Sequence, residues 1–479
     1  MPLILPGNVA TATASTTYSV ANSCRFNKPD SAYLVRTLGT PTDVDKWSYS
    51  VWVKRANLGA NNYLIVAGSN GTNWTEINFN ASDDLRWADY QGSYDGQLIT
   101  DRKFRDVGAW YHLLFAYDAD NGVAGNRMRI YVNGVEETSF STDDTPVSGK
   151  DMMLNSAVSH TIGSSVAEGG TVDFDGYMAE VCFIDGQQLT PTSFGEFDED
   201  SPTIFKPIDV SGLTFGNNGF YLDFEDSDNL GDDESGNSLD FTETNIVAAD
   251  SSTDTPTNNF CVMNPLDDYY PNSTFSEGNC KIVTTASSTT FNTGTFGLSS
   301  GLWYFEVEVT TVSDADYIGI TGEPSDASDD WAGANEYAWS YYGYTGNVYN
   351  DNSYVSYGAA YNTNGIVVGV YLDLNANKIY FSREGVIQNS GTGLSITDPA
   401  SVPSGVYFPQ LGNFHGTQST TYNVNFGGCP SFTISSAVAD TNGYGAFEYD
   451  PSDGGSSSFD SAAKDFLAIC TKNLGSDGG

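Results

Sequence analysis

The sequence predicts an all-β fold: two antiparallel β-sandwich domains of the jelly-roll type in tandem, with an extended N-terminal arm and an irregular connector. Three observations lead to this prediction. The chain has 479 residues, which is too long for a single small hydrophobic core and suits two sandwich domains. Aromatic residues make up 13% and glycines number 50, which favours half-buried pleated surfaces joined by tight turns. The same hairpin pattern also occurs once in each half of the chain.

That repeated pattern is a predicted three-stranded meander. Residues 110–137 and 365–389 each contain two alternating apolar runs separated by a polar turn, followed by a second turn and a third run. The second turn is Asn-Gly at residues 133–134 and Glu-Gly at residues 384–385. Alternation marks a strand with one buried face, and Asn-Gly favours a tight hairpin turn. Each half of the chain is therefore expected to hold one sandwich.

The charge balance is strongly acidic. Asp and Glu number 61 against 19 Lys and Arg, which gives a formal net charge of −42. Nucleic acids and anionic membranes need basic clusters that neutralise phosphate, and the sequence shows none, so no nucleic acid is expected as a partner. In the simplest interpretation the acids keep the protein soluble.

The sequence indicates neither export nor a disulfide framework. The start, MPLILPGNVATATAST, lacks a basic leader and a long apolar run, so we expect synthesis in the cytoplasm without a signal peptide. Nowhere do about 20 apolar residues follow one another, so we expect no membrane insertion. The cysteines form no CxxC pair, which favours buried thiols in a reducing compartment. They are Cys24, Cys182, Cys261, Cys280, Cys429 and Cys470.

Residues 1–22 form the predicted N-terminal arm. Pro2 and Pro6 favour an extended chain over a helix. Two interpretations stay open at this point: a frayed chain end, or an arm that docks on a neighbouring subunit.

The first sandwich is predicted over residues 23–210, where short strand signals recur at regular intervals. Five motifs carry a resemblance to the concanavalin A-like, laminin-G-type jelly roll: Trp47–Arg55, Trp110–Asp118, Met128–Glu136, His160–Ser165 and Phe174–Pro191. The resemblance implies two packed antiparallel sheets. In many members it also implies a carbohydrate- or protein-binding surface with an optional calcium ion.

Residues 211–259 are predicted as an acidic connector with a returning strand near Tyr221 and Leu222. Its acids could wrap a hard cation such as Ca²⁺, which takes six to eight oxygen ligands. The spacing is not that of an EF-hand, and a solvated acidic connector is the favoured interpretation. No cofactor is required. The candidate metal ligands are Asp226, Asp228, Asp232, Asp233 and Glu234.

The second sandwich is predicted over residues 260–430, and residues 431–479 are predicted as a closing segment and tail. The motifs Trp303–Thr310, Tyr317–Gly322, Gly365–Val386, Val406–Gly412 and Val424–Gly428 resemble a SPRY (B30.2-like) domain in their order. That family is a bent sandwich whose loops bind a partner protein or peptide. It has no general catalytic role, so the resemblance implies recognition.

Residues 331–362 are dense in Tyr, Trp, Asn and Gly and form the best candidate contact surface. Tyr and Trp offer flat amphipathic area at low entropic cost, which suits stacking on sugar rings or on a protein patch. The alternative is that most of these rings pack in the core, and Tyr349, Tyr354 and Tyr357 favour that role. The candidate binding residues are Trp331, Trp339, Tyr341, Tyr342 and Tyr344.

The sequence does not favour an enzyme. The histidines, His112, His160 and His415, lie beside no nucleophile motif. Glu306 and Glu308 could form a glycosidase pair because they share one face of a strand. The favoured interpretation is that they are the solvent-facing half of the alternation in FEVEV.

The order of the parts gives a further resemblance. An LPGNVA arm, a laminin-G-like jelly roll, a DESGN connector, a SPRY-like domain and a closing FLAICTKNL segment are together similar to structural proteins of tailed bacteriophages, especially marine ones. The resemblance implies a protein of the virion tail or particle surface, made in the host cytoplasm. It would contact other virion proteins through its arm and form homo-oligomers.

Three functions follow, in order of preference. The first is a non-enzymatic tail fibre or appendage protein that binds host cell-surface glycan or protein during attachment. The second is a capsid decoration or tail scaffold protein that binds other virion subunits. The third is a glycan depolymerase.

Overall fold

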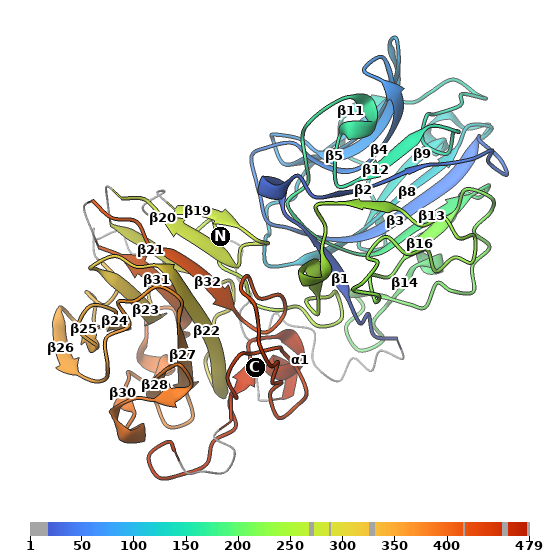
Figure 1. Ribbon diagram of the computed structural model, residues 1–479. Coiled ribbons are helices and arrows are strands. Elements are labelled where there is room, and N and C mark those ends of the chain that lie inside the picture. The colour runs from blue at the N-terminus through green and yellow to red at the C-terminus, as the bar shows by residue number, and fades with distance from the viewer. Residues whose placement is uncertain are drawn as a thin grey trace. The chain divides into compact units, whose positions relative to one another are not determined.

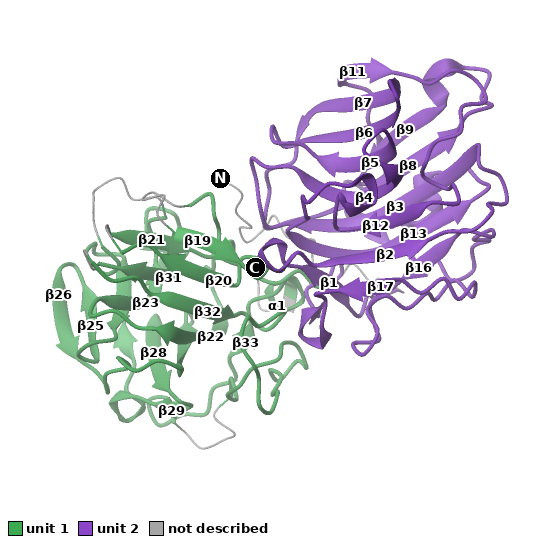
Figure 2. Cartoon of the chain, turned by 45° about the horizontal axis from the view of Figure 1, so that its top comes forward, with its two compact units in different colours: residues 1–13, 258–479 green, residues 14–257 purple. Residues whose placement is uncertain are grey.

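The computed structural model describes residues 18–267, 273–286, 289–324, 331–414, 417–452 and 458–476 (Figure 1). The chain divides into two compact units, one of residues 14–257 and one of residues 258–479 together with residues 1–13 (Figure 2). Each unit is built from packed β-sheets, and the described part contains one α-helix, α1 (Thr471–Ser476). The predicted all-β fold with tandem sandwiches is confirmed.

The first domain contains two eight-stranded sheets. The β3 sheet comprises, in spatial order, β10 (Val135–Glu136), β9 (Met128–Val132), β8 (Trp110–Asp118), β3 (Lys46–Arg55), β13 (Gly176–Asp185), β1 (Ser23–Phe26) and β18 (Ser251–Ser252), with β16 (Phe220–Leu222) paired to β13. The β6 sheet comprises β11 (Phe140–Asp144), β7 (Tyr94–Lys103), β6 (Asp84–Gln91), β5 (Asn73–Phe79), β4 (Asn62–Asn70), β12 (Ser159–Ile162), β2 (Tyr33–Thr37) and β17 (Thr242–Thr244). A separate pair joins β14 (Gly195–Phe197) and β15 (Phe205–Pro207).

The core of the first domain lies between these two sheets. Trp47 of β3 meets Trp87 of β6 with ring centroids 5.2 Å apart, and Phe183 of β13 stacks on Trp47 at 5.8 Å. All three side chains are fully buried. Burial of such large rings is the main stabilising term of a sandwich, because the free energy gained scales with the apolar area removed from water.

The described residues of the second domain also form two sheets, one of nine strands and one of six. The β22 sheet comprises β19 (Ser273–Ser276), β20 (Lys281–Thr284), β32 (Thr421–Asn425), β22 (Leu302–Thr311), β27 (Ile366–Asp373), β28 (Lys378–Arg383) and β29 (Val386–Ile387), with β30 (Leu394–Ser395) paired to β28 and β33 (Leu467–Ala468) paired in parallel to β22. The β23 sheet comprises β21 (Thr290–Thr293), β31 (Phe408–Asn413), β23 (Asp316–Thr321), β24 (Ala338–Tyr342), β25 (Asn347–Asn350) and β26 (Ser353–Ser356).

Short 3₁₀ helices occupy several connections. They are η1 (Lys28–Asp30), η2 (Ala124–Asn126), η3 (Val166–Glu168), η4 (Pro191–Ser193), η5 (Ala248–Asp250), η6 (Asn389–Gly391) and η7 (Pro399–Ser401). Among the described residues, no helix is long and apolar enough to cross a membrane.

Both predicted meanders are present, as β8–β9–β10 and as β27–β28–β29. Asn133 and Gly134 adopt positive φ angles of 49° and 78° at the turn of the first meander. Glu384 and Gly385 do the same at 51° and 71° in the second. These left-handed conformations close a tight hairpin, which is why the turn composition was informative.

In each domain a later segment of the chain covers the outer face of one sheet. In the first domain, Phe194, Val210 and Phe215 pack on Leu114 of β8 and Ile184 of β13. In the second domain, the rings of Tyr304, Tyr371 and Tyr380 on the β22 sheet are covered by three later rings; the covering residues are Phe447, Phe459 and Phe466. The outer face of one sheet per domain is thereby turned into a second apolar layer.

The predicted connector, residues 211–259, lies within the first domain up to residue 257. Its strand β16 pairs with β13, β17 pairs with β2, and β18 pairs with β1. The segment therefore contains three short strands where a single returning strand was predicted. The first and last strands of this domain, β1 and β18, are neighbours. In the second domain, Phe260 likewise bridges to Cys470.

The described part of the predicted arm begins at Tyr18, because residues 1–17 lie outside the described residues. The Tyr18 hydroxyl donates to Glu180 Oε2 at 3.0 Å, and the backbone N–H of Val20 donates to Thr257 Oγ1 at 3.1 Å. Residues 18–22 are thus attached to the first domain, and docking of the arm on another subunit stays a prediction.

Candidate functional sites

An open pocket lies on the outer face of the β6 sheet. We name it the Trp74 pocket; it has a volume of about 330 Å³ and is lined by Tyr63, Gly71, Trp74, Glu76, Arg86, Tyr94, Glu168, Gly169 and Gly170. Alternation along β5 places Trp74 and Glu76 on this face, while Thr75 and Ile77 between and beside them are buried towards the core. The floor of the pocket thus follows directly from the strand period.

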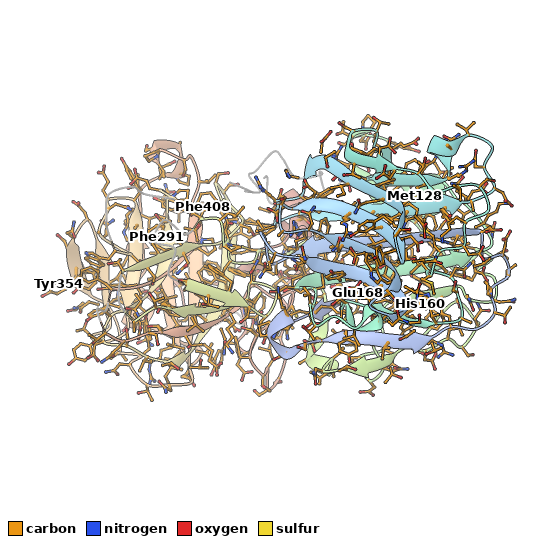
Figure 3. The ribbon with its side chains drawn as sticks, turned by 90° about the horizontal axis from the view of Figure 1, so that it is seen from above. Met128, His160, Glu168, Phe291, Tyr354 and Phe408 are labelled. Carbon is orange, nitrogen blue, oxygen red and sulfur yellow. The ribbon has the colours of Figure 1, made fainter. Side chains whose placement is uncertain are left out.

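The wall of the Trp74 pocket comes from η3, which is about 90 residues later in the chain than Trp74. Gly68 of β4 lies opposite Trp74, and a Cβ added there would lie 3.0 Å from the carbonyl oxygen of Ala167. The missing side chain therefore lets η3 approach the strand. Gly169 ends η3 at a φ of 84° and places Glu168 at the rim, where Figure 3 labels it.

Two aromatic rings on one side of the pocket, Trp74 and Tyr94, are supported by a third ring, Tyr90, which lies outside the lining. Trp74 stacks on Tyr90 with centroids 5.3 Å apart and an interplanar angle of 18°. Tyr94 meets both rings edge-on, at 6.1 Å from Trp74 and 5.2 Å from Tyr90. Tyr94 is 53% exposed and Trp74 is half-buried, so both rings offer area to a ligand.

A buried ion pair fixes the polar side of the pocket. The Arg86 guanidinium pairs with Glu76, whose side chain is 2% exposed, and donates to the Tyr94 hydroxyl at 3.1 Å. It also lies 5.8 Å from the Trp74 ring centroid. Arg86 therefore connects the carboxylate to both rings, and the three groups share one fixed arrangement.

Glu168 is the carboxyl group at the rim of the Trp74 pocket. Partial burial raises its pKa, while the charge of Arg86 and a hydrogen bond from Tyr63 lower it. Burial and the nearby Glu168 charge in turn raise the pKa of Tyr63 to about 12. The rim thus offers one acceptor-rich group and one hydroxyl beside the aromatic rings.

A second candidate surface lies on the outer face of the β23 sheet. We name it the Tyr/Trp surface; it consists of Tyr317, Trp331, Tyr342, Tyr344, Tyr349, Tyr354 and Phe414. Tyr317 stacks on Tyr342 at 4.9 Å and contacts Trp331 at 5.0 Å. Trp331 and Tyr349 meet edge-on at 5.0 Å. The rings form one connected set across neighbouring strands.

The structure divides the five predicted binding residues between two faces. Trp331, Tyr342 and Tyr344 belong to the Tyr/Trp surface, whereas Trp339 and Tyr341 are buried in the core. The reason is the period of β24, in which Trp339 and Tyr341 point inward and Tyr342 points outward. A contact surface must therefore be drawn without Trp339 and Tyr341.

Sequence reasoning missed four members of the Tyr/Trp surface. Tyr349 and Tyr354 were expected to be structural, yet the β25–β26 hairpin pairs them on the outer face. Tyr354 is 61% exposed, and Figure 3 labels this residue. Tyr317 of β23 and Phe414, which directly follows β31, also belong to this surface and were not considered. Only Tyr357 is buried as expected. The turn at residues 351–352 was the available signal, because it fixes the register of the hairpin.

Glu306 is not solvent-facing, contrary to the expectation from alternation. It lies on the outer face of β22 beneath the later segment and is fully buried. It accepts hydrogen bonds from the Tyr304 hydroxyl at 2.9 Å, from Asn425 at 3.1 Å and from the backbone N–H groups of Glu448 and Tyr449 at 3.0 and 2.8 Å. Both oxygens are occupied by these donors, so Glu306 offers no atom to a substrate.

The predicted metal ligands are not brought together. Asp233 accepts from the backbone N–H of Tyr221 at 2.9 Å and of Leu239 at 2.8 Å, and Asp226 accepts from that of Asp228 at 2.9 Å. These carboxylates shape turns. Within the described ranges, no group of three or more His, Cys, Asp or Glu side chains is arranged to hold a metal ion. Calcium binding by Asp226, Asp228, Asp232, Asp233 and Glu234 has no geometric support.

The described histidines are buried. His112 Nε2 lies 2.9 Å from Ser50 Oγ, but both side chains are covered, and burial lowers the pKa of His112 to about 3. His160 donates to the carbonyl of Val158 at 3.0 Å, and burial lowers its pKa to about 4. His415 lies outside the described residues. His112 and His160 are thus neutral core residues.

Comparisons with known families agree with these folds. Residues 30–192 match the model of the concanavalin A-like lectin/glucanases superfamily. Residues 302–409 match the model of the SPRY domain. The chain combines a concanavalin A-like domain with a SPRY domain. Both resemblances seen in the sequence are confirmed, whereas neither finding points to a phage particle. A search of curated proteins gives no match.

Two solved structures are similar to parts of the chain. The SPRY domain of human HERC1 is 15% identical, with a TM-score of 0.29, and the match covers 36% of this chain and 99% of that one. A protein described as a "putative carbohydrate binding protein" from Bacteroides ovatus ATCC 8483 is 17% identical, with a TM-score of 0.33, and the match covers 48% of this chain and 60% of that one.

Proposed function

We propose that the chain is a carbohydrate-binding protein that holds a sugar in the Trp74 pocket of its concanavalin A-like domain. The observation that carries this proposal is the combination of Trp74, Tyr94 and Glu168 around one open pocket of about 330 Å³. That volume lies at the lower end of the range for small-molecule sites. The family match over residues 30–192 supports it through a superfamily whose name includes lectins.

The chemistry of the pocket fits a sugar ring. The C–H face of a pyranose would pack on the exposed area of Tyr94 and Trp74, since aromatic rings provide flat apolar area. Its hydroxyl groups would donate to the Glu168 carboxylate. Arg86 and Glu76 hold the rings in place before the ligand arrives, which lowers the entropic cost of binding.

Charge favours a neutral sugar over an acidic one. The net charge of the chain is −42, and the pocket contains two glutamates against one arginine. A uronic or sialic acid would meet repulsion from both the pocket and the whole surface. We therefore expect neutral hexose-containing oligosaccharides to be the preferred ligands.

We propose binding without hydrolysis. Glu76 is buried and paired with Arg86, so only Glu168 of the two pocket carboxyls faces a ligand. Glycosidases need two carboxyl groups that both reach the scissile bond. The alternative, a glycan depolymerase, would use Glu168 as its acid, and the release of reducing ends by the wild-type protein but not by Glu168→Gln would establish it.

The test is a glycan array followed by calorimetric titration with the full chain. We expect neutral oligosaccharides to bind and Trp74→Ala to weaken them about tenfold, since stacking on one ring contributes about 1.4 kcal/mol. Phe197→Ala serves as the control, because Phe197 is an exposed ring of the same domain outside the pocket. Equal affinity of Trp74→Ala and wild type would refute the proposal.

The biological setting proposed from the order of the parts is attachment of a tailed phage to its host. In that setting the chain would be an appendage protein, and the sugar would belong to a host surface glycan. Mass spectrometry and antibody labelling of purified particles would test this. Labelling of the head, with particles that become unstable when the protein is deleted, would instead support a capsid decoration or tail scaffold protein.

A further inference from the structure

The β23 sheet of the SPRY domain contains no cationic side chain. No Lys or Arg occurs between Lys281 and Lys378, and none occurs between Arg383 and Lys464. All six strands of this sheet fall inside those two intervals. The Tyr/Trp surface on its outer face therefore has no positive charge of its own.

Several rings of the Tyr/Trp surface are open to solvent. Tyr344 and Phe414 are each 51% exposed, and Tyr354 is 61% exposed. Their neighbours hold them in place: Tyr354 packs on Tyr349 at 5.4 Å, and Phe414 packs on Trp331 at 6.0 Å. A connected, exposed aromatic patch of this kind usually marks an interaction site.

Exposed carboxylates lie on the loops next to this surface. The Tyr342 hydroxyl donates to the backbone oxygen of Asp314, whose carboxylate is exposed. Burial raises the pKa of Tyr342, and the neighbouring Tyr349 and Asp314 raise it further. Asp351 is exposed in the turn between β25 and β26, and Glu336 is exposed before β24. The charged groups described next to the rings are thus all negative.

We propose that the Tyr/Trp surface binds a Lys- or Arg-bearing segment of a partner protein. The electron-rich faces of Tyr and Trp attract ammonium and guanidinium groups, and nearby carboxylates strengthen that attraction. The absence of Lys and Arg from all six strands means that no cation of the sheet itself competes for the rings. An acidic or phosphorylated partner would meet only negative charge.

This inference is independent of the Trp74 pocket. The two surfaces belong to different domains and differ in ligand chemistry, one suited to a neutral sugar and the other to a cation. Failure of sugar binding would leave the Tyr/Trp surface proposal unaffected, and the reverse also holds.

The test uses the full chain and two synthetic peptides of equal length, one rich in Arg and Lys and one with Glu in their place. Fluorescence anisotropy at physiological salt would report binding. We expect the basic peptide alone to bind, and the double variant Tyr344→Ala/Tyr354→Ala to weaken it about tenfold. The variant Tyr344→Phe/Tyr354→Phe keeps both ring faces and should bind within about threefold of wild type.

Two controls separate ring recognition from attraction by net charge. Val386→Ala changes an exposed side chain of the same domain outside the Tyr/Trp surface and should leave binding unchanged. Trp74→Ala should also bind the basic peptide like wild type. If the alanine double variant binds that peptide as tightly as wild type, the attraction is due to net charge and the proposal fails.

A second copy of the chain is the competing occupant. Sedimentation as a function of concentration distinguishes it, because self-association that is lost in Tyr344→Ala/Tyr354→Ala would show that the surface is an interface between copies. That result would overturn the proposal of a basic partner segment. A monomeric chain that binds the basic peptide supports it.

Discussion

The two domains expose different chemistry on equivalent faces. In both, a later segment covers the outer face of one sheet, the β3 sheet in the first domain and the β22 sheet in the second. The candidate sites lie on the other sheet of each domain. The Trp74 pocket contains a fixed Arg86–Glu76 pair beside its rings, whereas the Tyr/Trp surface has rings without any cation. The comparison teaches that the covering of one outer face and the side chains on the other can vary independently of the sandwich fold.

The largest effect is expected from removing a ring that covers the β22 sheet. Phe466 is fully buried against Tyr371 at 5.2 Å and Phe459 at 4.9 Å. Phe466→Ala should lower the free energy of unfolding by about 3–5 kcal/mol, because it leaves a cavity. Denaturant titration would measure this. A loss below about 1 kcal/mol would mean that the covering segment is not part of the cooperative fold.

A second prediction concerns the buried glutamate under that segment. Burial raises the pKa of Glu306 to about 7, although four donors lower it. Glu306→Gln places an amide N–H group against those donors, so we expect the unfolding free energy to fall by about 3 kcal/mol. The loss should be largest near pH 4.5 and should shrink as the pH rises through 7, because the raised pKa of Glu306 makes ionisation costly in the wild type and the variant cannot ionise. Equal stability of variant and wild type in denaturant titration would contradict the assigned hydrogen bonds.

The first domain offers the contrasting glutamate. Glu180 sits at a bulge of β13 and accepts from the hydroxyls of Tyr18 and Tyr221 through Oε2 alone. Burial raises its pKa to about 7 from an ordinary value of 4.5. The folded state therefore favours the protonated form, and the stability that this provides is complete below about pH 4.5 and lost as the pH rises through 7.

Glu180→Gln keeps an acceptor for both tyrosines and cannot ionise. We expect the variant to be about 2 kcal/mol more stable than wild type at pH 8 and to match it near pH 4.5. Denaturant titrations at pH 4.5, 6, 7 and 8 would give the difference curve. A flat difference between the two proteins would show that Glu180 does not titrate in this range.

The smallest effect is expected in the Trp74 pocket. Arg86→Lys retains the charge but loses the fork that reaches both Glu76 and Tyr94. Sugar affinity should fall about fivefold, which corresponds to about 1 kcal/mol, with little change in melting temperature. Calorimetric titration of the variant would measure this. An unchanged affinity would show that Arg86 does not position the rings of the pocket.

The sequence was informative wherever a local rule decided the structure. Alternation and Asn-Gly turns predicted both meanders, because strand faces and hairpin turns depend on neighbouring residues. The same rule failed to choose a face for β24, where Trp339 and Tyr341 on one side and Tyr342 on the other are all aromatic. Only the packing of the two sheets decides which side is inside.

Long-range packing explains the remaining errors. Glu306 does point away from the sandwich core, as alternation indicates, but residues more than 140 positions later cover it. The Trp74 pocket similarly needs η3 to lie across β4, and nothing around Trp74 in the sequence signals that approach. Sites that join distant segments are beyond single-sequence pattern rules.

The chain enters and leaves each domain at neighbouring points. Ser23 lies opposite Ser252 in the first domain, and Phe260 lies opposite Cys470 in the second. A module with this property can be inserted into a surface loop of a host protein or circularly permuted without stretching its framework. Neighbouring chain ends thus make each domain compatible with insertion into another chain.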